Sequence, residues 1–112
     1  MKHKQTKATD ISRKVKAVVG ERDGGCCIIC GKRGSPNAHF IARSHGGMGI
    51  EQNIVTLCHA CHNEFDNGTG KYRTSLEQAI EDYLKLKYPN WDRSKLIFDK
   101  WKELDPRWLM GN

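Results

Sequence analysis

Two Cys-x-x-Cys pairs constrain this chain more than any other feature of its sequence. Cys27 and Cys30 form the first pair, Cys58 and Cys61 form the second, and 27 residues lie between the pairs. In a Cys-x-x-Cys turn both thiolates reach the same side of the backbone, so two such turns complete the tetrahedral four-sulfur shell of a structural zinc ion. The stretch between the pairs is longer than in the commonest zinc ribbons, which predicts an inserted folded element.

Other interpretations of the cysteines are disulfides, a redox dithiol or buried apolar side chains. The basic N-terminus, residues 1–7, lacks the apolar stretch of a signal peptide, and no apolar run is long enough to span a membrane. We therefore expect a cytoplasmic protein with no membrane partner, and in that reducing compartment metal is favoured over disulfides. A redox pair normally opens the helix of a βαβ unit, which is not predicted here. Cys26 is interpreted as a bystander, because only Cys27 has the two-residue gap to Cys30.

Hydrophobic periodicity predicts an α+β chain in which two short strands lie among helices. A helix is expected from Asp10, as its N-cap, to Gly24. Short strands are expected over residues 38–41 and 54–57, and a helix from the second cysteine pair to about Asp66.

The C-terminal third of the chain is predicted to be helical. Residues 74–77, Thr-Ser-Leu-Glu, have the pattern of a capping box that starts a helix, and Pro89 should end this helix. Asp92 is expected to cap a last helix that ends before Pro106 and carries Ile97, Phe98, Trp101 and Leu104. At helical spacing the tail aromatic residues are expected in the core: Tyr83, Trp91, Trp101 and Trp108. We expect one domain with a basic flexible tail (1–9), a zinc-bound core with its preceding helix (10–70) and a helical extension (71–112).

Three polar residues between and just after the cysteine pairs add a second pattern. His39, Asn53 and His62 follow one another in that order, within the motifs Ala-His-Phe-Ile (38–41), Asn-Ile-Val-Thr-Leu (53–57) and Cys-x-x-Cys-His (58–62). With the first cysteine pair, this stretch resembles the HNH endonucleases, also called ββα-metal or His-Me finger nucleases. The resemblance covers residues 27–66, and small phage-type HNH proteins look most similar. It implies a zinc-stapled ββα-metal core, with an N-terminal helix before it and a helical extension after it.

The resemblance also implies a function and a role for each of these residues. The chain would be a metal-dependent DNA endonuclease with His39 as the general base, Asn53 as a structural residue of the site and His62 as a ligand of a catalytic divalent metal, Mg²⁺ or Mn²⁺. Asp66 lies four residues after His62, one helical turn away on the same face, so both could hold one ion. DNA is the implied partner, and small phage HNH proteins are associated with packaging (terminase) proteins.

Charge agrees with a nucleic-acid partner, because the formal net charge is +6. Arg43, Lys71 and Arg73 are the candidate nucleic-acid contacts, although basic loop residues are often only solvated. One departure from the family pattern concerns Ala38, because many relatives carry a metal-ligating Asp or His at this position. The alternative function is therefore a non-catalytic zinc-binding module that interacts with nucleic acid or with a packaging complex.

Overall fold

The computed structural model describes residues 4–98 of the chain, and side chains from residue 7 onward. Its elements are α1 (Lys4–Thr9), α2 (Arg13–Asp23), β1 (Ser35–His39), the 3₁₀ turn η1 (Arg43–His45), β2 (Ile54–Leu57), α3 (His59–Asn67), α4 (Gly70–Lys87) and the 3₁₀ turn η2 (Arg93–Leu96). The predicted α+β class is confirmed. None of the helices in this part of the chain has the length and apolar character needed to cross a membrane.

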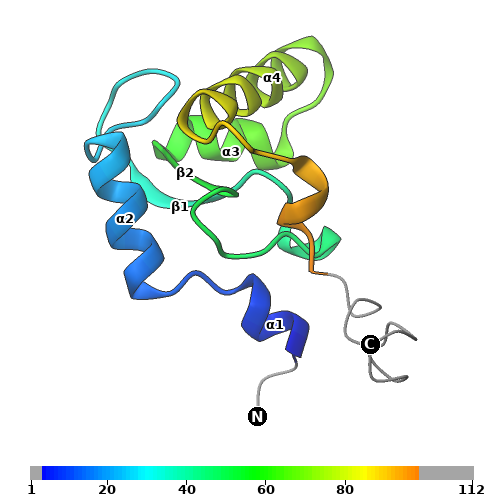
Figure 1. Ribbon diagram of the computed structural model, residues 1–112. Helices are drawn as coiled ribbons and strands as arrows, with labels where there is room; N and C mark the ends of the chain where they lie inside the picture. Colours follow the sequence, from blue (N-terminus) through cyan, green and yellow to red (C-terminus); the bar gives the residue numbers. More distant parts are fainter. Residues whose placement is uncertain (1–3, 99–112) are drawn as a thin grey trace, which may run out of the picture.

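A two-stranded antiparallel hairpin forms the centre of the molecule. Ala38 pairs with Val55 and His39 with Ile54. β2 has the predicted bounds, whereas β1 begins three residues earlier than expected and ends at His39. Every residue of β2 is buried, because α2 covers one side of the hairpin and α3 with α4 covers the other (Figure 1).

The helix before the hairpin starts later than predicted. Ser12, not Asp10, is the N-cap of α2, and its Oγ accepts a hydrogen bond from the N–H of Val15 at 3.1 Å. The carboxylate of Asp10 instead accepts a hydrogen bond from Arg43. The predicted end is confirmed, because Gly24 closes the helix in the left-handed conformation with φ of 67°.

The capping-box prediction for residues 74–77 is wrong. α4 begins at Gly70, so Thr74 lies within the helix and its Oγ1 donates to the carbonyl of Gly70 at 3.1 Å. The Thr-x-x-Glu pattern can also occur inside a helix, so the pattern alone does not mark a helix start. The helix ends at Lys87, before Pro89, as expected.

The last predicted helix is also wrong for the residues that are described. Asp92 does act as a cap, accepting from the N–H of Ser94 at 3.0 Å, but the element that follows is only the short turn η2. Ile97 leaves this turn to form a β-bridge with Gly47. The tail aromatics Trp101 and Trp108 lie outside the described residues, as do residues 1–3.

Residues 4–9 belong to the N-terminal segment that the sequence predicted to be a flexible basic tail, and they are helical in the structure. They form α1, and Thr9 at its end is only 3% exposed. The backbone carbonyls of Ala8 and Thr9 accept hydrogen bonds from the N–H of Gly49 and from His39.

Aromatic residues from several elements meet in the core. Phe40 follows β1 and packs edge-to-face on Trp91, with ring centroids 5.7 Å apart, and lies 6.4 Å from the ring of Phe65 in α3. Tyr83 and Trp91 are partly buried against this core, which agrees with the prediction for these two aromatics.

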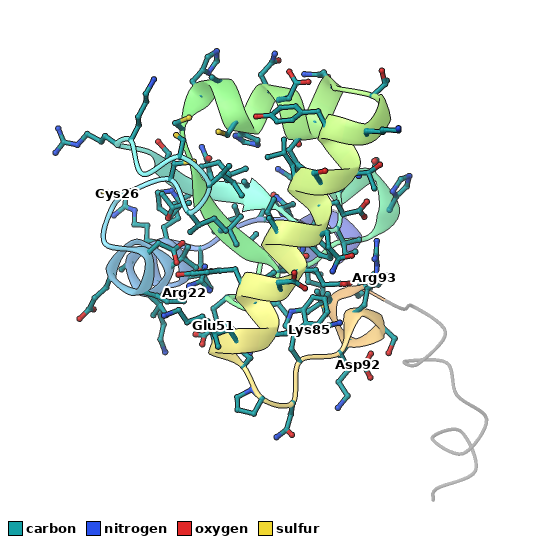
Figure 2. The ribbon with its side chains drawn as sticks, turned by 90° about the horizontal axis from the view of Figure 1, so that it is seen from above. Arg22, Cys26, Glu51, Lys85, Asp92 and Arg93 are labelled. Carbon is teal, nitrogen blue, oxygen red and sulfur yellow. The ribbon has the colours of Figure 1, made fainter. Side chains whose placement is uncertain are left out.

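A buried ion pair joins α2 to both sides of the hairpin. The Asp23 side chain is fully buried and accepts from Arg22 at 2.7 Å, from the N–H of Thr56 in β2 at 2.9 Å and from the hydroxyl of Tyr83 in α4 at 2.5 Å. Arg22 also donates to the carbonyl of Glu51 at 2.9 Å, and Figure 2 shows these two residues next to each other. The network therefore connects α2, β2 and α4 through a single carboxylate.

Candidate active site and metal centre

Four cysteines from the two pairs converge on one point. The Sγ atoms of Cys27, Cys30, Cys58 and Cys61 all lie within 4.8 Å of one another, and those of Cys30 and Cys58 are 3.5 Å apart. Four sulfurs at about 2.3 Å from a tetrahedral zinc ion lie about 3.8 Å from each other. The donor set and its spacing therefore fit a structural zinc ion.

The backbone around two of the thiols, Cys27 and Cys58, favours the thiolate form that a metal needs, whereas burial raises the pKa of Cys61. Cys58 is the N-cap of α3, and its Sγ accepts from the N–H of Cys61 at 3.4 Å, which lowers the pKa of the Cys58 thiol. Burial acts to raise the pKa of Cys27, but the backbone N–H groups directed at its sulfur outweigh burial and bring this pKa to about 7. Cys26, labelled in Figure 2, is exposed and outside the cluster, as expected for a bystander.

His39 is the last residue of β1, and a backbone carbonyl holds its ring. Its Nε2 lies 2.8 Å from the carbonyl oxygen of Thr9. Since a carbonyl can only accept, Nε2 carries the proton and Nδ1 of the neutral ring keeps its lone pair. Burial lowers the pKa of His39; the Thr9 hydrogen bond opposes this shift, and the positive charge of Arg43 adds to it. At a pH where an ordinary histidine is half protonated, the neutral form of the ring therefore predominates, and its Nδ1 can accept a proton.

Asn53 fixes the backbone that follows His39. Its side chain is completely buried. Its Oδ1 accepts from the N–H of Ile41 at 2.8 Å, and its Nδ2 donates to the carbonyls of Met48 at 2.8 Å and Ile41 at 3.2 Å. One amide thus ties the end of the first strand to the loop before the second.

His62 and Asp66 form a pair on α3. The Nε2 of His62 and the Oδ2 of Asp66 are 3.0 Å apart, and the two side chains are 28% and 51% exposed. Ala38 is fully buried and offers no ligand. Within residues 4–98, the four cysteines are the sole group of three or more metal-binding side chains with ligand atoms close together. The pair can therefore supply two protein ligands to an ion that keeps other positions for water or phosphate, as Mg²⁺ does.

His39 and the His62–Asp66 pair line one cleft. Its volume is about 1100 Å³. It is lined by residues of the N-terminal segment, α2, β1, the η1 loop and α3: Lys7, Asp10, Ile11, Ser12, Lys16, Asn37, His39, Ala42, Arg43, Ser44, His62 and Asp66. The hairpin and α3 therefore place a candidate base, a candidate metal-binding pair and several cations around a single cavity.

Comparison with known proteins identifies the central part of the chain. Residues 27–67 match the family model described as HNH endonuclease. The chain carries an HNH domain. No curated protein and no solved structure matched the chain. The HNH domain contains both cysteine pairs, the hairpin and α3, whereas α1, α2 and α4 lie outside the matched segment.

Two of the three predicted nucleic-acid contacts do not line the cleft of the HNH domain. Arg73 donates to the carbonyl of Phe65 at 3.1 Å and to Glu77 at 2.8 Å, and its guanidinium lies 4.4 Å from the centre of the Phe65 ring. It joins α4 to α3. Lys71 is exposed on α4 and does not line the cleft. Arg43 is half exposed at the rim of the cleft, where it pairs with Asp10.

Several cleft residues were missed by the sequence analysis. Asn37 lies two positions before His39 on the same strand, so the two-residue period of a strand could have identified it. Lys7, Asp10 and Lys16 come from the N-terminal segment and α2. No motif marks them, because they reach the HNH domain only through the packing of these elements.

Proposed function

We propose that this protein is a metal-dependent DNA endonuclease that hydrolyses phosphodiester bonds in the cleft of its HNH domain. One observation carries the proposal. His39, whose ring is held by a hydrogen bond and whose Nδ1 can accept a proton, lines the cleft. The His62–Asp66 pair, which is suited to a divalent cation, lines the same cleft.

His39 is the general base in this proposal. Its Nδ1 takes a proton from the attacking water, while Nε2 stays bonded to the carbonyl of Thr9. The lowered pKa of His39 keeps the ring unprotonated near neutral pH, so the base is available where the enzyme would work. Asn53 holds the backbone after β1 and so limits where the ring of His39 can move.

His62 and Asp66 hold the catalytic cation in this proposal. Their two ligand atoms are 3.0 Å apart and accessible from the cleft. A bound Mg²⁺ or Mn²⁺ supplies positive charge to the scissile phosphate and to the leaving oxygen. Two protein ligands are few, so we expect weak binding of the cation in the absence of DNA.

Cations around the cleft would bind the DNA backbone. Lys7, Lys16 and Arg43 line the cleft, and they would contact phosphates without reading the sequence. Affinity should therefore fall steeply with salt concentration. Lys71, which is exposed on α4, remains a predicted contact for DNA that extends beyond the cleft.

A second candidate function follows from Ala38. This residue is buried and cannot complete a metal site, so a zinc-stapled module that binds nucleic acid or a packaging (terminase) protein without cutting DNA is the alternative.

Plasmid cleavage separates the two functions. Supercoiled plasmid is incubated with the zinc-loaded protein and Mg²⁺, Mn²⁺ or Ni²⁺, in parallel with His39→Ala and with the control His45→Ala, which changes an exposed histidine outside the cleft lining. We expect the parent and His45→Ala to nick the plasmid and His39→Ala to bind it without nicking. Equal cutting by His39→Ala would remove this residue from the mechanism. Binding without cutting by all three proteins would favour the non-catalytic module.

A further inference from the structure

The segment just before α2 lies outside the HNH match, yet three hydrogen bonds attach it to the HNH domain. The N–H of Gly49 donates to the carbonyl of Ala8 at 3.0 Å. The Nε2 of His39 contacts the carbonyl of Thr9 at 2.8 Å, and Arg43 pairs with the carboxylate of Asp10. Three consecutive residues thus each contact a different part of the domain, and two of the three partners line the cleft.

The approach of this segment to the domain is close enough to require a glycine. A Cβ built on Gly49 would lie 2.1 Å from the carbonyl oxygen of Asp10 and 2.6 Å from its carbonyl carbon. These are backbone atoms, so no side-chain rotation could relieve the clash. Thr9 is 3% exposed, and Gly49 is buried. The contact is therefore a packed interface and not a loose end resting on the surface.

We propose that Ala8, Thr9 and Asp10, which we call the N-terminal strap, complete the active site by holding His39 in the tautomer and orientation that a general base requires. This inference rests on the proposed nuclease function. It assigns a positioning role to a backbone carbonyl outside the family-matched segment.

The contact with Thr9 determines which nitrogen of the His39 ring carries the proton. A neutral imidazole has one N–H, and a carbonyl oxygen at 2.8 Å can only be a partner for that N–H. With the strap in place, Nδ1 is the unprotonated nitrogen and carries the free lone pair. Without the strap, both tautomers become available to a ring that is partly exposed to the cleft, and rotation about its side-chain bonds is no longer opposed by this hydrogen bond. Only part of the population would then present a lone pair to the attacking water.

Asp10 adds a second effect at the same edge of the cleft. Its carboxylate holds the guanidinium of Arg43, whose positive charge also acts on His39. The strap therefore sets the position of the nearest cation as well as that of the base. Both effects depend on the same short segment, so one perturbation should change them together.

The first test uses the unmodified chain loaded with zinc. Nitrogen NMR of the imidazole groups distinguishes protonated from unprotonated ring nitrogens, and the spectrum of His39→Ala identifies the His39 signals. At a pH where His39 is neutral, we expect a protonated Nε2 and an unprotonated Nδ1. A protonated Nδ1, or an average of the two tautomers, would overturn the proposal without any reference to activity.

The second test displaces the strap with Gly49→Ala. The control is Gly20→Ala in α2, where the added Cβ would meet only the Pro36 side chain, at 3.9 Å. We expect Gly49→Ala to keep its zinc and to lose the tautomer preference of His39. Its kcat for plasmid nicking should fall by about 10²-fold, the usual effect of misplacing a reacting group by about 1 Å, with KM little changed.

The outcomes separate the strap from the nuclease function. Unchanged kcat in Gly49→Ala, despite a lost tautomer preference, would refute the positioning role. Loss of zinc in Gly49→Ala would leave the NMR spectrum of the unmodified protein as the deciding result. If the unmodified protein cuts no DNA but shows the expected tautomer, the proposed function fails while the strap contact stands.

Discussion

Replacing Asp23 with asparagine tests how the hairpin that carries His39 is held between the helices. Asp23 accepts hydrogen bonds from α2, β2 and α4, and its side chain is fully buried. Asparagine has nearly the same shape, but it has no charge and presents an N–H₂ group where the carboxylate had a second accepting oxygen. At least one of the donors around it must then face another donor.

The expected magnitude follows from the partner that is left behind. The Arg22 side chain is only 10% exposed, and breaking a buried ion pair by removing one partner typically costs about 3–5 kcal/mol. Arg22 keeps the carbonyls of Glu51 and Ile54 as acceptors at 2.9 and 2.7 Å. These remaining bonds place the expected loss at the lower end, about 3 kcal/mol, which is a large part of the 5–15 kcal/mol typical of small domains.

Urea unfolding of the zinc-loaded protein measures this loss. With a slope of about 1 kcal/mol per M urea, 3 kcal/mol moves the midpoint by about 3 M. The matched control is Asp82→Asn, which removes an exposed carboxylate of α4 and should change stability by less than about 0.5 kcal/mol. Zinc concentration is kept equal in all samples, because metal binding adds to the measured stability.

A small effect would refute the reasoning. If Asp23→Asn shifts the midpoint no more than Asp82→Asn does, the carboxylate is not what holds α2, β2 and α4 together. The hydrogen bonds to Arg22, Thr56 and Tyr83 would then make no net contribution to stability.

Three further predictions concern the metals and the base. Metal analysis should find one zinc per chain. Cys61→Ser, or removal of zinc by a chelator, should unfold the domain, because structural zinc contributes roughly 10 kcal/mol or more to folding. Retention of the native fold after complete zinc removal would contradict this. Burial lowers the pKa of His39, so kcat/KM should rise with pH and level off with an inflection below about pH 6.5, the ordinary histidine value; an inflection above that value would argue against His39 as the base. Asp66→Ala should raise the Mn²⁺ concentration needed for half-maximal nicking by about tenfold, whereas Glu64→Ala on the same helix should not. Equal metal titrations for the two variants would exclude Asp66 as a ligand.

The sequence predicted well those parts of the molecule that depend on local residue patterns. The four cysteines cluster as their spacing predicted, and β2 has the predicted bounds. In each case the chemistry is contained in a few neighbouring residues: a two-residue gap between thiols, or a continuous run of residues buried on both faces. Gly24 ends α2 for the same reason, because only its own backbone conformation is needed.

Helix starts were predicted less well, because capping residues compete for other partners. Asp10 could have capped α2, but Arg43 binds its carboxylate and Ser12 takes the capping role. The Thr74–Glu77 pattern lies within α4 and not at its start. Arg73, a candidate DNA contact, also bonds the carbonyl of Phe65 and lies over its ring, so it joins α3 to α4. Arg43 lies 33 residues after Asp10, so only the fold brings this competing partner to the carboxylate.

By itself, the sequence determined the four-cysteine cluster, the HNH domain and the order of the hairpin and α3, because these depend on residue types at short, fixed spacings. Only the tertiary structure decided that Ala38 is buried, that His39, His62 and Asp66 share a cleft with Lys7 and Arg43, and that Thr9 holds the ring of His39. The contact with Thr9 joins residues 30 positions apart through a backbone carbonyl. Every residue has such a carbonyl, so the residue type carries no sign of the contact, and only packing of the chain brings the two groups together.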